Sequence, residues 1–570
     1  MFNLHIADIV TLALYLIGVT ALGLFAARKV KSLSDFVMPR KFGKAFMLMH
    51  GFGTSTHSDQ AVSVASKTFT SGLAGIWYQW MWLFATPFFW LIAPMMRRFR
   101  ALTTADVFEA RFDRSVSILY SFLGLAKFMV GIALMLKGSA VIIEGTTNGA
   151  LTAEITIPVI TVMFVAYGIA GGLRAAILTD FIQGILTLLF SFLLLPMVLS
   201  AVGGIAGMKE TIGGMYPDKE MFSLVAPGGI TVFFVVMISI NSLLGVVVQP
   251  HNMGTCGAGK TEIEGAVGFM GGTLLKRVCT VAWCLTGLGA IAFYGKDMLP
   301  EPDQVYGAMA REFLPQISPG LLGLFIAALL ATVMGSCDSF MIASSGLISQ
   351  NIYKPLFPNK SDRHYLSVAR YSSLIVVGGG VAIAFASEDV VSLLEKLWVV
   401  NTVMAMAFWL GVFWRRTTVA GAWAATLATI GMWGFCLTKW GVAFFEKLSG
   451  RFDFVVEKKG ELVVSLPWQM LFYIITGFAA GIIVSLLTKW VSKEKLDNFY
   501  NLLRTPVQPD EEISAPCTLP EGVEPGPRRV FFPNTNLEIP VPSWRAVIGF
   551  LVGWVVVGGI IVVVAIWIAE

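Results

Sequence analysis

Charged residues are scarce in this chain, and it lacks cysteine pairs and a basic N-terminal leader. Only 14% of its 570 residues are charged, against roughly 25% in soluble globular domains. Its six cysteines include no C-x-x-C pair and no spacing typical of a metal site. The N-terminal stretch MFNLHIAD has no Lys or Arg before its apolar run, so we expect no cleaved signal peptide. These absences argue against a soluble protein, a disulfide scaffold and a metal-cluster protein.

Long apolar runs fill most of the chain. Hydrophobic residues make up 56% of it, and long runs of them recur along almost the whole length. A run of about 18 residues or more is typical of a helix that spans a bilayer. The sequence therefore predicts an all-α polytopic membrane protein in a lipid bilayer. We expect about fourteen spans, at residues 6–26, 45–66, 75–96, 117–141, 154–171, 176–200, 228–248, 273–294, 319–347, 367–386, 390–413, 418–439, 467–488 and 545–568.

Positive charge falls in alternate loops between these spans. Because loops rich in Lys and Arg stay in the cytoplasm, this side is predicted to be cytoplasmic, with both chain ends outside. We expect the bacterial inner (plasma) membrane as the location. Lys127 and Lys137 lie inside the fourth span instead, where we expect them to snorkel or to pair with an acid. The loop residues are Arg28, Lys29, Lys31, Arg40, Lys41, Arg97, Arg98, Arg100, Arg111, Arg114, Lys276, Arg277, Lys354, Lys360, Arg363, Arg415 and Arg416.

Two stretches outside the spans carry distinctive patterns. Residues 254–261, GTCGAGKT, match the phosphate-loop pattern G-x-x-x-x-G-K-[ST]. The loop around them holds roughly 25 residues, too few for the βαβ unit that such a site requires, so we predict no nucleotide partner, and we expect no nucleic acid either. Residues 489–543 are rich in proline. Because proline removes a backbone donor and fixes φ, we predict an irregular cytoplasmic loop there.

The second predicted span carries polar residues that a lipid-facing helix does not tolerate. Its centre, GFGTSTHSDQ, contains two glycines, four hydroxyl residues, His57, Asp59 and Gln60. Partial unwinding there would expose backbone carbonyls and helix ends, from which transporters build ion and substrate sites at mid-bilayer. A polar helix packed entirely against its neighbours is the alternative.

Two further spans contain carboxylates. In the ninth, three hydroxyl residues recur on one helical face, with Asp338 beside them. Oxygen ligands of this kind suit a hard cation, although small hydroxyl residues also form ordinary helix-packing surfaces. In the sixth, Asp180 lies about one turn inside the membrane, and charged groups there usually face a protein interior or a water-filled path. The two aspartates indicate a route for a cation or a proton. The hydroxyl residues are Thr332, Ser336 and Ser339.

Four stretches resemble the sodium/solute symporter family, the group that includes the bacterial sodium/proline and sodium/galactose transporters. They are GGLRAAILTDFIQ, VVVQPHNM, ATVMGSCDSFMIASSGLISQNIYK and LGVFWRRTT, and the likeness covers residues 6–490. The resemblance implies a leucine-transporter-like core of five plus five inverted helices. The implied divisions are an extra helix and basic loop at 1–44, inverted repeats at 45–200 and 228–413, accessory helices at 414–488, the proline-rich loop at 489–543 and a C-terminal helix at 544–570.

The resemblance also implies binding residues. Members of this family bind sodium between the broken first core helix and the eighth core helix. The implied cation ligands are Thr54, His57, Thr332 and Ser336 at one position, and Asp180, Asp338 and Ser339 at a second. The implied solute contacts are Asp59, Gln60, Asn241, Trp398 and Asn401.

The chain departs from the family pattern within the ninth span. Gly335 stands where many members have a hydroxyl residue, and Asp338 replaces what is often serine. His57 adds an imidazole that titrates near neutral pH. Sodium and proton coupling therefore both remain open at this point.

The predicted function is secondary active symport of a small polar organic solute by alternating access, with sodium as the expected co-substrate. The alternatives are a proton-coupled transporter of the same fold and a transporter-like solute sensor that does not transport. A sensor would need a cytoplasmic output domain, for which residues 489–543 are too short. We expect no enzyme activity and no cofactor.

Overall fold

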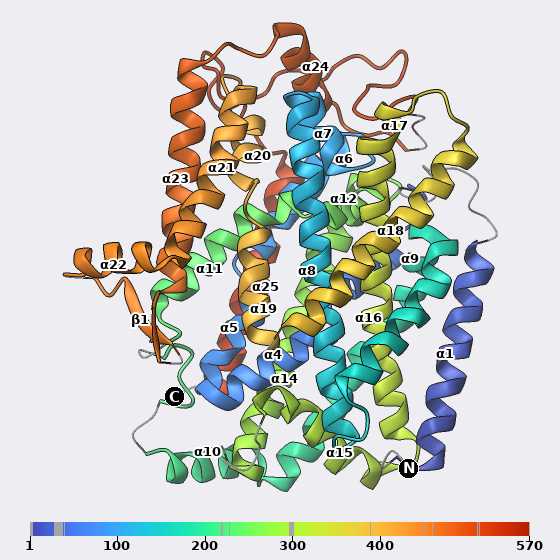
Figure 1. The fold of residues 1–570 in the computed structure, drawn as a ribbon, viewed down its shortest axis with the longest axis vertical. Helices are drawn as coiled ribbons and strands as arrows, with labels where there is room; N and C mark the ends of the chain where they lie inside the picture. The colour runs from blue at the N-terminus through green and yellow to red at the C-terminus, as the bar shows by residue number, and fades with distance from the viewer. Residues whose placement is uncertain are drawn as a thin grey trace.

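The computed structural model describes residues 4–27, 38, 40–217, 220–226, 229–295, 301–387, 389–450, 452–458, 460–509, 511 and 513–568. Arg28, Lys29 and Lys31, three of the predicted positive loop residues, lie outside these ranges. Helices dominate the described residues, and the strands among them form one short antiparallel hairpin (Figure 1). The helical class predicted from the sequence is therefore confirmed.

The elements follow one another along the chain without a sheet between them. The first part contains α1 (Ile6–Ala27), α3 (Lys44–Ser55), α4 (Ser58–Ser71), α5 (Trp77–Trp80), α6 (Phe89–Arg98), α7 (Thr104–Arg111), α8 (Arg114–Thr146), α9 (Ala153–Ala201) and α10 (Gly204–Met215). The middle part contains α11 (Val232–Gly245), α12 (Pro250–Gly257), α13 (Glu262–Ala266), α14 (Gly272–Tyr294), α15 (Val305–Ile317), α16 (Leu321–Gly346), α17 (Lys354–Leu356), α18 (Asp362–Ala386), α19 (Val390–Val400) and α20 (Ala405–Phe413). The last part contains α21 (Val419–Leu437), α22 (Lys439–Leu448), β1 (Val455–Lys458), β2 (Glu461–Val464), α23 (Leu466–Leu487), α24 (Lys493–Arg504) and α25 (Trp544–Trp567).

Two of the apolar helices are broken in the middle. The backbone between α3 and α4 is extended at Thr56 and His57. The segments Val232–Val248 and Pro250–Gly257 meet at an angle of 71°. Pro250 starts the second segment without loss, because the first residues of a helix have no intrahelical use for their N–H groups. Residues 254–257 of the phosphate-loop match thus form the end of α12, and the Lys260 N–H donates to the Phe42 carbonyl at 3.1 Å.

The number of spans differs from the prediction. Nine helices among the described residues are long and apolar enough to cross a membrane, or ten if the bent pair counts as one span. The fourteen predicted spans are not all single long helices, because the second and third divide into shorter pieces, α3 with α4 and α5 with α6. The predicted spans at 154–171 and 176–200 run together in α9, a helix of 49 residues.

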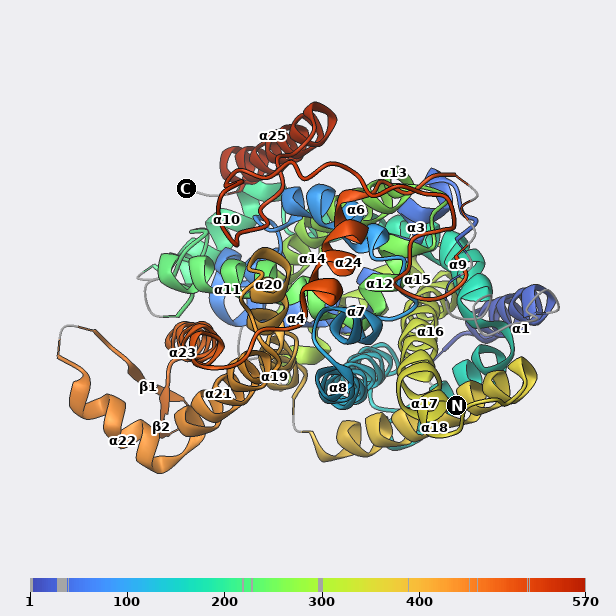
Figure 2. The ribbon, with the colours of Figure 1, turned by 90° about the horizontal axis from the view of Figure 1, so that it is seen from above.

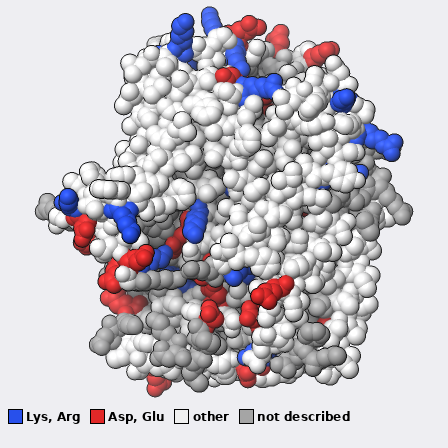
Figure 3. Space-filling view, in the orientation of Figure 1, with Lys and Arg blue, Asp and Glu red and all other residues white. Residues whose placement is uncertain are grey.

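Charge is distributed unevenly over the molecule. Figure 3 shows many of the Lys and Arg side chains at the upper end, where Figure 1 has α17 and α24, and mostly acidic side chains at the lower end. Both chain ends lie in the lower part of Figure 1. Lys276 and Arg277 do not belong to the charged end, because both are fully buried inside α14. Their placement in a loop was wrong, because the helical segment already starts at Glu262.

Residues 489–543, called here the C-terminal strap, lie across the upper end of the molecule. In Figure 2 the helix of this strap, α24, crosses the middle of that end, and α25 stands at the edge. Leu496, Phe499 and Leu502 bury one face of α24, as their spacing on a helix requires. The prediction of an irregular loop was therefore wrong for α24, whose polar residues hide a short apolar stripe.

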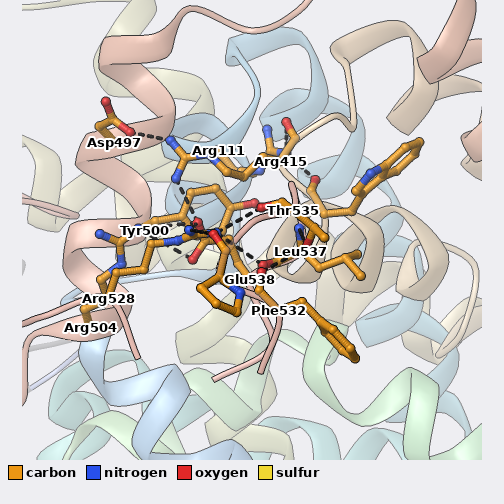
Figure 4. A network of polar contacts seen from close by, with 12 residues as sticks. Arg111, Arg415, Asp497, Tyr500, Arg504, Arg528, Phe532, Thr535, Leu537 and Glu538 are labelled. Carbon is orange, nitrogen blue, oxygen red and sulfur yellow. Dashed lines mark hydrogen bonds and ion pairs between the residues drawn. The ribbon is translucent and has the colours of Figure 1, made fainter. Parts of the chain in front are cut away.

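Ion pairs hold the strap to the helices beneath it (Figure 4). Glu538, with 3% of its side chain exposed, accepts from Arg415 at 2.9 Å and from Arg528 at 3.1 Å. The Glu538 N–H donates to the carbonyl of Phe413, at the end of α20, at 2.8 Å. Tyr500 donates from its hydroxyl to the Gly411 carbonyl of the same helix at 2.7 Å. The strap is thereby fixed to α20.

A second set of contacts joins the strap to the end of α6. Arg100 pairs with Glu511 at 2.5 Å, and the two side chains are 0% and 3% exposed. Arg98 pairs with Glu262 at 2.8 Å and also donates to the Leu503 carbonyl at 3.2 Å. The strap therefore touches helices from both of the expected repeats.

Candidate functional site

The break between α3 and α4 confirms the predicted unwinding of the second span. A helix end leaves carbonyl groups without intrahelical partners, and side chains of this chain take them. His57 Nε2 lies 3.0 Å from the Thr54 carbonyl, and Gln60 Nε2 lies 3.1 Å from His57 Nδ1. Because the Gln60 amide donates to Nδ1, the ring carries its hydrogen on Nε2 and donates to Thr54. The imidazole thus donates to the carbonyl of Thr54, one of the cation ligands that the resemblance implies.

The neighbouring carbonyls are also taken by protein donors. The Lys276 ammonium donates to the Ser55 carbonyl at 2.5 Å, and the Gln60 amide donates to the same oxygen at 3.0 Å. The Ser336 hydroxyl donates to the Gly53 carbonyl at 3.3 Å. A cation is favoured at the negative end of a helix, and here Lys276 supplies one. Its burial in α14 hid this role from the sequence analysis, which assigned it to a loop.

Asp180 is paired with a histidine that the sequence analysis missed. His50 Nδ1 lies 2.7 Å from the Asp180 carboxylate, and both side chains are 1% exposed. Thr54 Oγ1 lies 3.2 Å from the same nitrogen. His50 precedes Thr54 by four residues, so both lie on one face of α3. That spacing was the available signal, and it carries meaning only once Asp180 is known to lie opposite.

The side chains of α9 meet α16 at a glycine. A Cβ at Gly335 would lie 2.5 Å from Gln183 Oε1 and still closer to Asp180 Oδ1. Gln183 is 2% exposed, and its amide has no hydrogen-bond partner among the described residues. Two buried oxygens therefore converge on the bare backbone of α16. Gly335 lies directly against Asp180, and Asp338 is buried in the same helix.

The remaining cation candidates lie on both sides of this point. Thr332 donates from its hydroxyl to the Leu329 carbonyl of its own helix at 2.7 Å. Ser336 reaches α3, as described above. Ser339 is 4% exposed, and its hydroxyl has no hydrogen-bond partner among the described residues. The structure thus brings Thr54, Ser336 and Asp180 to one place, with Ser339 one turn further along α16.

Two of the predicted solute contacts are engaged within the protein. Gln60 braces the helix break, as shown above. Asn241 donates from Nδ2 to the Trp398 carbonyl at 3.2 Å and accepts from the Tyr473 hydroxyl at 2.6 Å. These bonds tie α11 to α19 and to α23. The side chain of Asn241 therefore supports the packing of these helices.

Other predicted solute contacts keep unused polar atoms. Trp398 Nε1 and Asn401 Oδ1 are buried and have no hydrogen-bond partner among the described residues. Asp59 Oδ1 lies 3.4 Å from His57 Nδ1. The backbone of α8 approaches Asp59 at Gly138, where a Cβ would lie 2.6 Å from the Asp59 Cα. Trp398 Nε1 and Asn401 Oδ1 are therefore polar atoms of the predicted set that no described residue engages in a hydrogen bond.

A small cavity lies on each side of the helix break. The α12 cavity, of about 20 Å³, is lined by residues that include His50, Thr54, His251 and Ser339. The α15 cavity, also of about 20 Å³, is lined by residues that include His57 and Thr332. A cavity needs about 10–15 Å³ to hold one water molecule. Both spaces are therefore of ion or water size.

Lys127 does not behave as predicted. It is 4% exposed, so it does not snorkel, and it donates to His251 Nδ1 at 3.1 Å instead of pairing with an acid. Its Nζ also lies 3.8 Å from the centre of the Phe340 ring. The prediction failed because the helices that bring His251 and Phe340 to this lysine are far away in the sequence.

Known proteins of similar sequence are transporters. The chain is 25% identical to the sodium/pantothenate symporter of Haemophilus influenzae over 465 residues, covering 78% of this chain and 93% of that protein. It is 24% identical to the high-affinity proline transporter of Bacillus subtilis over 510 residues, covering 84% and 98%.

Solved structures show the same fold. A Na+-coupled sialic acid symporter in a substrate-bound outward-open state superposes with a TM-score of 0.69 at 17% identity, covering 86% of this chain and 99% of that one. A nucleobase-cation-symport-1 family transporter superposes with a TM-score of 0.51 at 11% identity, covering 81% and 99%. As a family, sodium:solute symporters match residues 36–429. The broken helices, the buried carboxylate and this match over most of its length together show that the chain belongs to the sodium:solute symporter family, whose members are membrane transporters and not enzymes.

Proposed function

We propose that the protein is a secondary active symporter that couples the entry of a small polar organic solute to sodium by alternating access. The observation that carries this proposal is the convergence of buried oxygens from Asp180 and Gln183 on the bare backbone at Gly335, beside Ser336. Hard cations prefer such oxygen ligands. A tenfold sodium gradient contributes about 1.4 kcal/mol per ion, and 100 mV of potential adds about 2.3 kcal/mol per charge.

The cation contacts in this proposal follow the geometry around α3, α9 and α16. Binding of sodium replaces the protein donors that now satisfy the carbonyls of the break, His57 above all. The first position uses the backbone carbonyls of Thr54, His57 and Thr332 and the hydroxyl of Ser336, and the second uses Asp180, Asp338 and Ser339. The solute contacts are Asp59, Trp398 and Asn401, whose polar atoms are available, with Gln60 and Asn241 shaping the site from behind.

The proposed architecture is a leucine-transporter-like core. Residues 45–200 and 228–413 form the two inverted repeats, and each contains one of the broken helices. Residues 1–44, 414–488 and 544–570 supply the helices outside the core. The end that carries α24 faces the cytoplasm of a bacterial inner membrane, with both chain ends outside, because positive charge is retained on the cytoplasmic side.

Uptake into proteoliposomes tests the coupling. Solutes that stabilise the purified protein against heat in sodium buffer are first selected from a library, and their accumulation is then driven by a sodium gradient. We expect Ser336→Ala and Asp180→Asn to abolish sodium-driven accumulation. Ser344→Ala is the control. The Ser344 hydroxyl lies on the same helix and donates to the Met341 carbonyl of that helix at 2.8 Å. Full accumulation by both site variants contradicts the assignment.

One observation favours a second candidate, a proton-coupled transporter of the same fold. The His50–Asp180 contact of 2.7 Å joins two titratable groups where the family pattern expects a cation. In this case a pH gradient without sodium drives accumulation, and His50→Gln removes it. This candidate is rejected if sodium-driven uptake stays the same when the pH inside the proteoliposomes is changed.

A further inference from the structure

Lys127 is a buried basic group that the proposed function does not use. It lies within α8, a candidate membrane span, and no acidic side chain is paired with it among the described residues. Its contacts are His251 and the ring faces of Phe128 and Phe340. An ammonium group in such surroundings has lost its hydration without gaining a counter-charge. Ionisable residues inside a membrane protein usually mark the path of a substrate or ion.

The hydrogen bond between Lys127 and His251 fixes the direction in which this charge acts. An ammonium group can only donate, so His251 Nδ1 accepts, and the neutral ring then carries its hydrogen on Nε2. His251 lines the α12 cavity, whereas Lys127 stands behind it. The ring therefore keeps Nε2 as a hydrogen-bond donor, and the ammonium group bonded to Nδ1 places positive charge beside it.

Ser339, which the proposed function places at the second cation position, also lines this cavity, and a hydroxyl can donate to an anion while its oxygen binds a cation. Ser339 is 4% exposed, and its hydroxyl lacks a hydrogen-bond partner among the described residues. Buried hydroxyl groups are normally satisfied. An unsatisfied hydroxyl and an imidazole donor around about 20 Å³ of space suit one small acceptor group. The lining also contains His50, Thr54 and Thr103.

We propose that the α12 cavity is an anion subsite, in which His251, backed by Lys127, and Ser339 bind the carboxylate of the transported solute. This inference rests on the proposed function for the source of the carboxylate, because a symporter brings its cargo past α3, α12 and α16. A free monovalent anion such as chloride has the same chemistry and is the other source. The subsite makes acidic solutes the preferred cargo.

Paired probes on the unaltered protein test the chemistry. Thermal unfolding of the purified full-length chain is measured in sodium gluconate with proline against prolinamide, and with pantothenate against panthenol, since each pair differs at the carboxylate. We expect a member with a carboxylate to raise the unfolding temperature and its partner to leave it unchanged. Equal shifts from both members of each pair, or no shift from any carboxylate or from chloride, overturn the proposal.

Substitutions then locate the site. Lys127→Met removes the charge at similar length, and Lys127→Arg retains it. We expect Lys127→Met to weaken binding of the carboxylate by about tenfold or more, as loss of a charged hydrogen-bond partner does, and Lys127→Arg to restore part of it. Lys137→Met is the matched control, ten residues further along the same helix and partly exposed. If the folded Lys127→Met variant binds the carboxylate as well as the unaltered protein does, the proposal is overturned.

Two further arms separate the possible sources and keep the symport question apart. Stabilisation by chloride that depends on Lys127, without any response to carboxylates, assigns the subsite to a free anion. Carboxylate binding without sodium-driven accumulation contradicts the symport proposal and leaves the subsite standing. If sodium drives the accumulation of neutral or cationic solutes only, and Lys127→Met transports them normally, the symport proposal stands and the anion subsite is contradicted.

Discussion

Replacing Glu538 by Gln tests whether charge holds the C-terminal strap in place. The Glu538 carboxylate is 3% exposed and faces the guanidinium groups of Arg415, Arg504 and Arg528. Removing one partner of a buried ion pair costs about 3–5 kcal/mol. We take about 3 kcal/mol, because Arg528 is 31% exposed and solvent screens part of its interaction. Burial lowers the pKa of Arg415, but its hydrogen bonds to Glu538 and Asp497 outweigh this effect, so the pKa is raised above its usual value.

Hydrogen–deuterium exchange measures this loss where it occurs. A local free-energy change of about 3 kcal/mol raises the opening constant, and with it the exchange rate of the strap amides, by about 150-fold. The diagnostic amides are those of Glu538, bonded to the Phe413 carbonyl, and Arg415, bonded to the Asn536 carbonyl, both at 2.8 Å. The helices in the middle of the molecule should keep their exchange rates.

The control for this variant is Glu524→Gln, which removes an exposed carboxylate from the same strap. We expect it to leave exchange in residues 489–543 unchanged. Equal exchange in Glu538→Gln and in the unaltered protein would refute the reasoning, because it would show that apolar packing of α24 alone holds the strap.

Three other substitutions test the site and its surroundings. Gly335→Ala inserts a methyl group against two buried oxygens and should lower the free energy of unfolding by about 1–3 kcal/mol in a denaturant titration, whereas Gly378→Ala, with open space at its Cβ, should not. Asp106→Asn should cost about 1–3 kcal/mol. Because burial raises the pKa of Asp106 above 3.8, the stability that this group contributes is fully present below pH 3.8 and is lost as the pH rises through the raised value, so the gap between variant and parent should narrow with rising pH. Asn241→Leu should lower the thermal unfolding temperature even without solute, because it leaves the buried Tyr473 hydroxyl unpaired; an unchanged unfolding temperature with impaired uptake would restore the solute-binding role.

The broken helix was predictable because its signal is local. Glycines, hydroxyl residues and His57 within ten positions are incompatible with a continuous lipid-facing helix, and the backbone is extended at Thr56 and His57. The face formed by Thr332, Ser336 and Ser339 was predictable for the same reason, since helical spacing alone defines it. Such features need no knowledge of any other helix.

The partners across helices were not predictable from one sequence. His50 and Asp180 are 130 positions apart, and Lys276 and Ser55 are 221 apart. Nothing in the local pattern around Lys276 shows whether its ammonium group binds the carbonyls at the buried end of another helix or lies at the membrane surface. Only the fold decides which carbonyl lies in front of it.

The division of the apolar runs into helices was not predictable for a related reason. Length and hydropathy describe a run of residues but do not show where the backbone bends or continues. The residues between the predicted spans at 154–171 and 176–200 stay helical within α9. The segment from α3 to α6 carries enough apolar residues for two spans, yet it is divided into short helices.

The path of the C-terminal strap has a mechanical consequence for alternating access. Leu503 and Glu511 of the strap bond to residues at the end of α6. Asn536 and Glu538 bond to residues at the end of α20. If those two helix ends move apart during a transport cycle, the C-terminal strap must either lose its contacts with one of them or change its own shape. We therefore expect the strap to limit how far these two helix ends separate, unless the ion pair of Glu511 with Arg100 or that of Glu538 with Arg415 breaks.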